Sequence, residues 1–437
     1  MKKVLIATML FSGCFAIAQG PDLQKDYTAI EGKVVEWRRD IHQNPELGNR
    51  EFKTAEKIAK HLESLGIEVK TGVAYTGVVG LLKGEQPGKV VALRADIDAL
   101  PVPERNDLPY KSTVMGEFMG NEVPVMHACG HDTHTAILMG VAEVLAKNKN
   151  KIKGTIKFIF QPSEEGPPPG EEGGALLMVK EGVMENPKVD AIFGLHINSQ
   201  TPVGVIRYKS GGTMAAAQSF TINVKGKQSH GSQPWSGVDP ILISAKIIDG
   251  LQTIISRETE LTQEAAVITV GKITSGVRFN IIPESAEMIG TIRTLDYGMK
   301  DKLNKRMVEM VETIAQAYGG TATCVIKDAT DITYNEPALV DQMLPTMRRV
   351  AGKENVQTTK AITGAEDFSY FQKEAPGFFF FLGGMTPGNT ESFPHHTPDF
   401  KIDDSGLILG VKTLTEMSLD YLNSDLTPVL GNPVKGE

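Results

Sequence analysis

The segment Pro376-Gly-Phe-Phe-Phe-Phe-Leu-Gly-Gly384 decides the fold class. Its five central residues are large and apolar, with Pro-Gly before them and Gly-Gly after them, and this pattern indicates a strand buried on both faces rather than an aromatic ligand platform. Four other short runs are similarly apolar, at residues 78–82, 90–93, 156–160 and 191–195. Strands of this kind are typical of a largely parallel sheet, so the sequence predicts an α/β fold.

Helical segments alternate with these strands along the chain. Apolar residues recur at helical spacing through residues 28–66, with a break at Asn44-Pro45, and helices also fit at residues 132–147, 172–182 and 406–421. Because a sheet that is apolar on both faces must be covered on both, we expect these helices to pack against it.

The pattern changes near residue 210. Strands at residues 220–224 and 267–270 alternate polar with apolar positions, and further strands are expected at 286–294 and 321–326. Two helices with apolar faces lie between them, at residues 238–251 and 303–314, which gives the order βαββαβ of a compact ferredoxin-like domain. We therefore expect a first domain at residues 19–209, an inserted domain at 210–327, and the rest of the first domain at 328–437.

The first 18 residues have the pattern of an export signal. Lys2 and Lys3 precede a short apolar run, and Ala16-Ile-Ala18 has the small-x-small pattern of a cleavage site. We expect a signal peptide at residues 1–18 and a periplasmic or secreted protein. A lipoprotein signal at Cys14 stays open and would be the sole reason for membrane attachment; a buried N-terminal strand is a third interpretation.

Composition narrows the possible functions. The 437 residues include 45 Lys plus Arg and 53 Asp plus Glu, a formal net charge of −8, so the chain lacks the basic character that nucleic-acid binding requires. If Cys14 leaves with the signal, only Cys129 and Cys324 remain, too few for a disulfide framework. Cys129 therefore needs another explanation.

Histidines and acids gather near the ends of predicted strands, where open α/β sheets bind ligands. The clusters are Gln161-Pro-Ser-Glu-Glu165, Gly194-Leu-His196, Pro394-His-His-Thr-Pro398 and, opening a helix, Met126-His-Ala-Cys-Gly-His-Asp132. Thiolate, imidazole and carboxylate are standard ligands of transition metals, so the clusters together predict a site for one or two ions. Each cluster alone has a plainer explanation, such as a structural histidine or a solvated acidic pair.

These motifs, with Leu93-Arg-Ala-Asp-Ile-Asp-Ala-Leu-Pro101 and Gly364-Ala-Glu-Asp-Phe368, resemble the amidohydrolase branch of the M20 metallopeptidase family. That branch includes hippurate hydrolases, N-acyl-amino-acid amidohydrolases and auxin-conjugate hydrolases. The resemblance runs from about residue 30 to residue 420. It implies a metallopeptidase catalytic domain on the largely parallel sheet, with an inserted dimerisation and lid domain, and therefore a homodimer.

The resemblance also implies a site that holds two divalent metal ions, zinc or else manganese, cobalt or nickel. Glu164 would be the general base, and His230 would reach across the dimer to the reacting carbonyl. Asn280 and Arg293 would receive the substrate carboxylate. The implied metal ligands are Cys129, His131, Glu165, His196 and His396, with Cys129 bridging the ions.

Two stretches depart from the wider family's pattern. Arg94-Ala-Asp96 stands where His-x-Asp is usual, so Asp96 is not assigned as the residue that orients a ligand. The loop Gly166-Pro-Pro-Pro-Gly170 is longer and stiffer than usual, which leaves the shape of the adjacent pocket open.

We expect metal-dependent hydrolysis of N-acyl amino acids, with hippurate-like substrates, to a free amino acid and a carboxylic acid. Arginine binds a carboxylate through two parallel hydrogen bonds, so Arg293 favours a product with a free α-carboxylate. One alternative is an exported dipeptidase or carboxypeptidase of the same family, but no extra acid marks a pocket for a free amine. The other is a non-catalytic binding protein, which would have no reason to keep Glu164.

Overall fold

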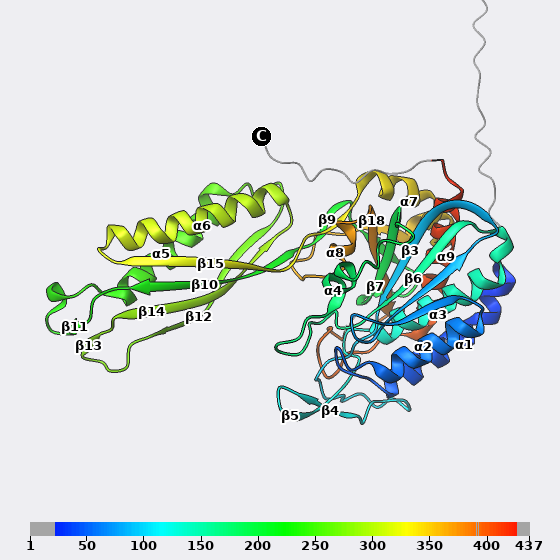
Figure 1. Ribbon diagram of the computed structural model, residues 1–437, viewed down its shortest axis with the longest axis horizontal. Coiled ribbons are helices and arrows are strands. Elements are labelled where there is room, and N and C mark those ends of the chain that lie inside the picture. Colours follow the sequence, from blue (N-terminus) through cyan, green and yellow to red (C-terminus); the bar gives the residue numbers. More distant parts are fainter. Residues whose placement is uncertain (1–21, 390, 392, 426–437) are drawn as a thin grey trace, which may run out of the picture.

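The structure, a computed structural model, describes residues 22–389, 391 and 393–425 (Figure 1). The predicted signal peptide at residues 1–18, with Cys14, lies outside the described residues.

The main body is built on an eight-stranded sheet in the order β1-β2-β6-β3-β7-β18-β8-β17. Its four central strands are parallel, and the edges contain antiparallel pairs, β1 with β2, β2 with β6 and β18 with β8. The predicted largely parallel sheet is therefore confirmed, with a mixed periphery. The strands are β1 (Glu68–Val73), β2 (Gly77–Lys83), β3 (Gln86–Asp96), β6 (Lys153–Gln161), β7 (Ala191–Pro202), β8 (Ile206–Tyr208), β17 (Val356–Thr358) and β18 (Gly377–Met385).

The phenylalanine run forms β18 and is buried on both faces of the sheet. Phe378 and Phe380 belong to the core on one face, while Phe379 and Phe381 belong to the core on the other. All four are at most 5% exposed, and Phe379 lies 4.9 Å from Phe368, ring centre to ring centre. Doubly buried packing explains why this strand does not alternate.

One strand interior contains a charged side chain. Lys157 of β6 is 2% exposed, and its Nζ donates to the carbonyls of Val183, Glu185 and Pro187 at 2.7 to 2.9 Å. An ammonium group has three N–H donors, so these carbonyls satisfy all of them. The run at residues 156–160 can therefore form a buried strand despite its lysine.

Helices cover both faces of the main sheet (Figure 1). The predicted long helical segment is two helices, α1 (Gln24–Gln43) and α2 (Phe52–Ser64), separated at the Asn44-Pro45 break. These pack on one face with α3 (His131–Lys147), α7 (Pro337–Ala351) and α9 (Leu407–Asn423), while α4 (Gly174–Lys180) and α8 (Ser369–Gln372) pack on the other. Among the described residues, no helix is long and apolar enough to cross a bilayer.

A second lobe follows the predicted order βαββαβ and has its own apolar core. Its antiparallel sheet has the strand order β12-β14-β10-β15, covered on one face by two helices (Figure 1). The last strand was expected to end at residue 326 and continues to Thr330. The elements are β10 (Ala216–Lys225), α5 (Pro240–Thr253), β12 (Ala266–Ser275), β14 (Ser285–Thr294), α6 (Tyr297–Ala317) and β15 (Thr321–Thr330).

Three short strand pairs complete the described structure. β11 (Ser229–His230) pairs with β13 (Ile281–Ile282) at the tip of the second lobe, the end remote from the main sheet (Figure 1). β9 (Gly211–Met214) pairs with β16 (Thr333–Asn335) near the junction of the lobes. β4 (Met115–Phe118) and β5 (Asn121–Pro124) form a hairpin that projects from the main body.

Candidate metal centre

The candidate site lies where the parallel strands β6, β3 and β7 approach their carboxyl ends. Residues 162–166, which we name the base loop, follow β6, and Asp98 follows β3. His196 was expected just after a strand, but it lies within β7. Pairing between β3 and β7 ends at Gly194, so His196 lies just beyond the end of that pairing and is available to the site.

Two groups of potential ligands share Cys129. One contains Cys129, His131 and His196, the other contains Cys129, Glu165 and His396, and within each group the ligand atoms lie within 4.8 Å of one another. Cys129 Sγ is 3.3 Å from His196 Nε2 and 3.2 Å from His396 Nε2. The fold therefore brings the five predicted ligands together, in two sets joined by the thiol.

The hydrogen bonds of the histidines test whether these side chains fit a metal. His131 Nδ1 lies 2.9 Å from the carbonyl oxygen of Asp98, so it is the protonated nitrogen, and Nε2 is buried without a hydrogen-bond partner. His196 Nδ1 lies 2.6 Å from the Ile197 carbonyl oxygen, which turns its Nε2 lone pair toward Cys129. Imidazole nitrogens grouped with a thiol in this way suit a divalent cation.

The same reasoning excludes two neighbouring histidines as ligands. His134 Nδ1 lies 2.6 Å from Asp96 Oδ1, and its Nε2 accepts a hydrogen bond from the Ile197 amide at 2.8 Å. His395 Nδ1 lies 3.1 Å from the Cys129 carbonyl, and its Nε2 accepts from the Ser199 amide at 3.3 Å. Both rings use both nitrogens within the protein, so they support the site without contributing to the ligand set.

Electrostatics at Cys129 also favour a cation. Burial raises the pKa of this thiol well above its ordinary value, and the carboxylates of Glu165 and Glu164 raise it further. A thiolate at this position therefore needs a nearby positive charge, and coordination to a metal ion supplies it.

Glu164 and Glu165 both approach His131 Nε2, at 3.9 and 4.0 Å, and they differ in their other neighbours. Glu164 Oε2 lies 3.9 Å from His131 Nε2, and its carboxylate also approaches those of Glu366 and Asp367. Burial and then Glu366 raise the pKa of Glu164 well above its ordinary value. A buried carboxyl group beside the potential ligands is placed to accept a proton and to return it.

Buried charges behind Glu164 explain the Arg94-Ala-Asp96 departure. Arg94 Nη1 lies 2.6 Å from Asp96 Oδ2, and Nη2 lies 2.9 Å from Glu366 Oε1 and 3.0 Å from Asp367 Oδ1. The arginine thus neutralises a cluster of carboxylates. Burying these charges without a partner would be costly.

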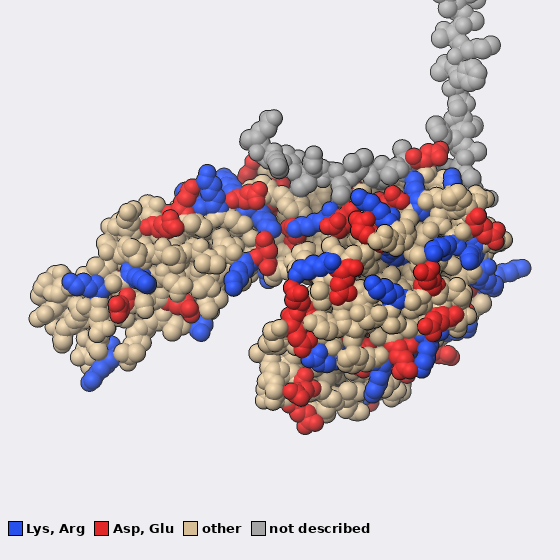
Figure 2. All heavy atoms as spheres, viewed as in Figure 1, with Lys and Arg blue, Asp and Glu red and all other residues tan. Residues whose placement is uncertain are grey.

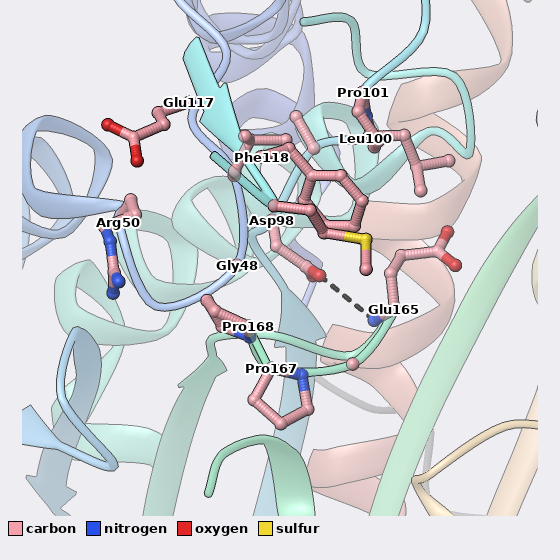
Figure 3. Close-up of a pocket in the computed structure, with 14 residues that line it drawn as sticks. Gly48, Arg50, Asp98, Leu100, Pro101, Glu117, Phe118, Glu165, Pro167 and Pro168 are labelled. Atoms are coloured by element: carbon pink, nitrogen blue, oxygen red, sulfur yellow. Dashed lines mark hydrogen bonds between the residues drawn. The ribbon is translucent and has the colours of Figure 1, made fainter. Parts of the chain in front are cut away.

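Asp98 orients His131, a role that the sequence analysis did not assign to it. Its Oδ1 lies 3.1 Å from His131 Nδ1, and its Oδ2 accepts a hydrogen bond from the Glu165 amide at 3.0 Å (Figure 3). Asp96, the residue considered from the motif, instead contacts His134 and Arg94. The available signal was the position of Asp98 in the same motif, two residues beyond Asp96, where β3 ends.

The remaining predicted site residues lie in the second lobe. His230 is in β11 and Asn280 immediately precedes β13, so both are at the tip, away from the metal ligands of the same chain (Figure 1). Arg293 is near the end of β14, where its Nη1 donates to Thr291 Oγ1 at 2.8 Å. Within the part of the chain that the structure describes, no acid forms an ion pair with Arg293.

A pocket of about 320 Å³ opens beside Glu165 (Figure 3). The Pro-rich loop contributes Pro167 and Pro168, and the β4–β5 hairpin contributes Glu117, Phe118 and Met119. The lining is therefore mostly apolar, and the loop of unusual length forms one wall. Leu47, Gly48, Arg50, Asp98, Ala99, Leu100, Pro101, Glu165 and Gly166 complete the lining.

Comparisons with known proteins show what this chain is similar to. Residues 92–420 match the model of Peptidase family M20/M25/M40. The chain is 42% identical over 405 residues to thermostable carboxypeptidase 2 of Saccharolobus solfataricus, covering 92% of this chain and 98% of that protein. It is 36% identical over 397 residues to an N-acetylcysteine deacetylase of Bacillus subtilis, covering 91% and 98%. The YXEP protein of B. subtilis, described as a dinuclear metal binding peptidase, is similar with a TM-score of 0.76 and 33% identity, over 90% of this chain and 99% of that one.

Proposed function

Because this chain belongs to the M20 peptidase family, in its amidohydrolase branch, we propose that it hydrolyses the amide bond of N-acyl amino acids. Membership of the family makes it a metal-dependent hydrolase of amide or peptide bonds. The observation that carries the proposal is the pair of ligand sets that share Cys129, with the Glu164 carboxylate beside them.

Two divalent ions would be held by Cys129, His131, Glu165, His196 and His396. Bound there, they would lower the pKa of a shared water and polarise the acyl carbonyl. Glu164 accepts a proton as the water oxygen bonds to the carbonyl carbon, and it delivers that proton to the nitrogen as the C–N bond breaks. The products are a carboxylic acid and an amine, which for this substrate class is an amino acid.

The second lobe supports a site completed by a homodimer. His230 and Asn280 lie together at its tip, where the Gly231 amide donates to the Asn280 carbonyl at 2.8 Å. Nearby, Val277 and Phe279 are each 95% exposed. Apolar side chains this exposed mark a surface that a partner covers. In this arrangement the tip of one subunit reaches the metal ligands of the other, and Arg293, which forms no ion pair among the described residues, binds the substrate carboxylate.

A carboxypeptidase or dipeptidase activity is the second candidate, and one observation favours it. Glu117 lines the pocket beside Glu165, whereas Arg50 in the same pocket is already paired with Glu171 at 2.6 Å. Glu117 is thus an acid that could bind a free amine of the substrate. The sequence analysis had not identified such an acid. The thermostable carboxypeptidase relative is consistent with such substrates.

Kinetics on matched substrates separate the two candidates. Purified protein is loaded with Zn²⁺, Mn²⁺, Co²⁺ or Ni²⁺ and assayed on N-acetyl and N-benzoyl amino acids and on dipeptides with the same carboxyl-terminal residue. The proposal expects kcat/KM for N-acyl substrates to exceed that for dipeptides by about tenfold or more. The reverse order would establish the peptidase, and a Glu164→Gln preparation controls for contaminating hydrolases.

We further propose that the protein is exported and loses residues 1–18. Lys2, Lys3 and Ala16-Ile-Ala18 support this. Intact-mass analysis of the protein recovered outside the cytoplasm should show Gln19 as the first residue. A diacylated Cys14 would establish the lipoprotein alternative, and retention of Met1 would contradict both.

A further inference from the structure

Two buried carboxylates hold the base loop, one on each side of Glu164. The Ser163 amide donates to Glu51 Oε1 at 2.9 Å, and the Glu165 amide donates to Asp98 Oδ2 at 3.0 Å. These amides belong to the residues directly before and after Glu164. The backbone that carries the proposed base is therefore fixed at both ends.

Glu51 is placed for this contact by its own surroundings. It immediately precedes α2 and is fully buried, and its second oxygen accepts a hydrogen bond from Thr76 Oγ1 at 2.6 Å. Burial and the neighbouring Asp98 raise the pKa of Glu51. The Glu51 side chain belongs to neither ligand set that shares Cys129. Its contact with the site is therefore the hydrogen bond to the base loop.

The base loop needs such support because its backbone is strained. Ser163 has φ of 55°, in the left-handed region, which is unfavourable for a residue with a side chain. Gly48 packs so closely that a Cβ there would lie 2.8 Å from Ser163 Oγ. A strained conformation persists only where neighbouring groups impose it, and the hydrogen bond from Ser163 to Glu51 is one such group.

We propose that Glu51 is a positioning residue that holds the backbone of the base loop so that Glu164 reaches the attacking water. This rests on the proposed function through the assignment of Glu164 as the base. Glu51 acts through Ser163 and touches no reacting atom, so its loss should slow the chemical step while the metal ligands keep their places.

The test compares Glu51→Ala with Glu51→Gln and with a matched control, Glu46→Ala. Glu46 lies in the same short segment and accepts hydrogen bonds from the amides of Lys53 and Thr54 at 3.1 and 2.9 Å, without bonding to the base loop. All variants are measured for bound metal, thermal stability, kcat and KM on the best substrate of the wild type.

Glu51→Ala should lower kcat by about 10- to 100-fold, with KM and metal content near those of the wild type. Glu51→Gln should recover most of kcat, because its amide oxygen can accept from Ser163 and its NH₂ can donate to Thr76. Glu46→Ala should lose thermal stability but keep kcat. An equal kcat loss in Glu46→Ala, or no recovery in Glu51→Gln, would overturn the proposal.

Two further measurements keep the test decisive. If Glu51→Ala does not fold, Thr76→Val removes one of the two hydrogen bonds to Glu51 and should give a smaller kcat loss. An unchanged kcat would contradict the positioning role of Glu51. If the wild type hydrolyses no substrate, the proposed function fails by itself. Hydrogen exchange at residues 162–166 then tests directly whether Glu51 holds the base loop. Faster exchange in the Glu51 variant than in the Glu46 variant supports this role, and equal exchange refutes it.

Discussion

Neighbouring carboxylates with different contacts give the most direct prediction at the scale of single residues. Glu164→Gln removes the proposed base, so kcat should fall by at least about two orders of magnitude while metal content and KM change little. Glu165→Gln alters a group 3.0 Å from His396 Nε2, so metal affinity should fall first and excess metal should partly restore activity. Metal stoichiometry and kcat of both variants provide the measurement, and near-normal kcat in Glu164→Gln would disprove the mechanism.

Cys129 belongs to both ligand sets, so its loss should affect both ions. Cys129→Ala should lower bound metal and activity together, and plasma mass spectrometry measures the metal. Cys324 is the control, because Cys324→Ala removes a thiol in the second lobe, away from either ligand set. Full metal content with normal turnover in Cys129→Ala would leave Cys129 a structural residue.

The sequence could identify candidate ligands but not the residues that position them. Cys129, His131 and Glu165 occur in short motifs whose residue types already indicate metal binding. Asp98 and Glu51 act through hydrogen bonds to His131 and to the base loop, and such bonds connect segments that are far apart in sequence. No local pattern distinguishes a buried aspartate that orients a ligand from one that neutralises Arg94.

The β4–β5 hairpin is the element whose prediction concerns substrate choice. Phe118 lines the pocket beside Glu165, so Phe118→Ala should lower kcat/KM for N-benzoyl substrates by about tenfold and change N-acetyl substrates much less. Met115 on the same hairpin lies in a different cavity, so Met115→Ala is the control. Equal losses for large and small acyl groups would mean that this pocket does not bind the acyl group.

Helices α1 and α3 are joined by a buried charge cluster with a specific pH dependence. His42 lies 2.8 Å from Asp132 and 3.2 Å from Glu104, and Arg38 Nε lies 3.0 Å from Asp132. Burial and Arg38 lower the pKa of His42, but hydrogen bonds to Asp132 and Glu104 outweigh them and raise it overall. The protonated imidazole therefore stabilises the fold fully below its unfolded pKa of about 6.5, and this contribution is lost as pH rises through the raised pKa.

His42→Gln should accordingly destabilise the protein most near pH 6, by about 3 to 5 kcal/mol, and progressively less at alkaline pH. Thermal unfolding of both proteins from pH 6 to pH 9 measures the difference. Lys60→Gln, which breaks an exposed pair with Glu56, should leave the shape of the pH curve unchanged. Parallel curves for His42→Gln and the wild type would show that His42 is neutral in the folded protein.

Long apolar elements were predictable and short or interrupted ones were not. The run at Phe378 and the helical spacing of α1 each carry a periodic pattern over enough residues to specify the element. Helix α7 contains Pro345, and an interior proline indicates a helix break because it removes a helical hydrogen bond. The helix nevertheless continues through Pro345, and its apolar residues share one core with those of α9. The β4–β5 strands have four residues each, too few for a period to stand out.

At the scale of the whole molecule, the change in strand pattern near residue 210 predicted a second lobe of βαββαβ order. Its core is separate: Phe220 of β10 and Leu303 of α6 belong to one apolar cluster, and that cluster contains no residue of the main sheet. Lys and Arg side chains alternate with Asp and Glu side chains over the visible face (Figure 2). Figure 2 shows an open recess between the lobes. Its shape depends on the course of the segments that connect the lobes, and the spacing of apolar residues does not predict that course.

That recess leads to the last prediction, which concerns assembly. His230 lies at the far tip of the second lobe, whereas Glu164 lies in the main body, so one chain does not bring the two together (Figure 1). If the tip of one subunit completes the site of another, inactive His230→Ala mixed with inactive Glu164→Gln forms hybrid dimers in which one site has both residues. Random exchange should then restore about a quarter of wild-type activity.

A second mixture controls for unspecific recovery. Glu164→Gln and Cys129→Ala both damage the main body, so in their hybrids each site keeps one defect and no activity should return. Pull-down of differently tagged subunits measures the exchange in both mixtures. Rescue in the first mixture alone would require the tip of one subunit to act at the metal centre of its partner, whereas exchange without rescue would place His230 outside the reaction.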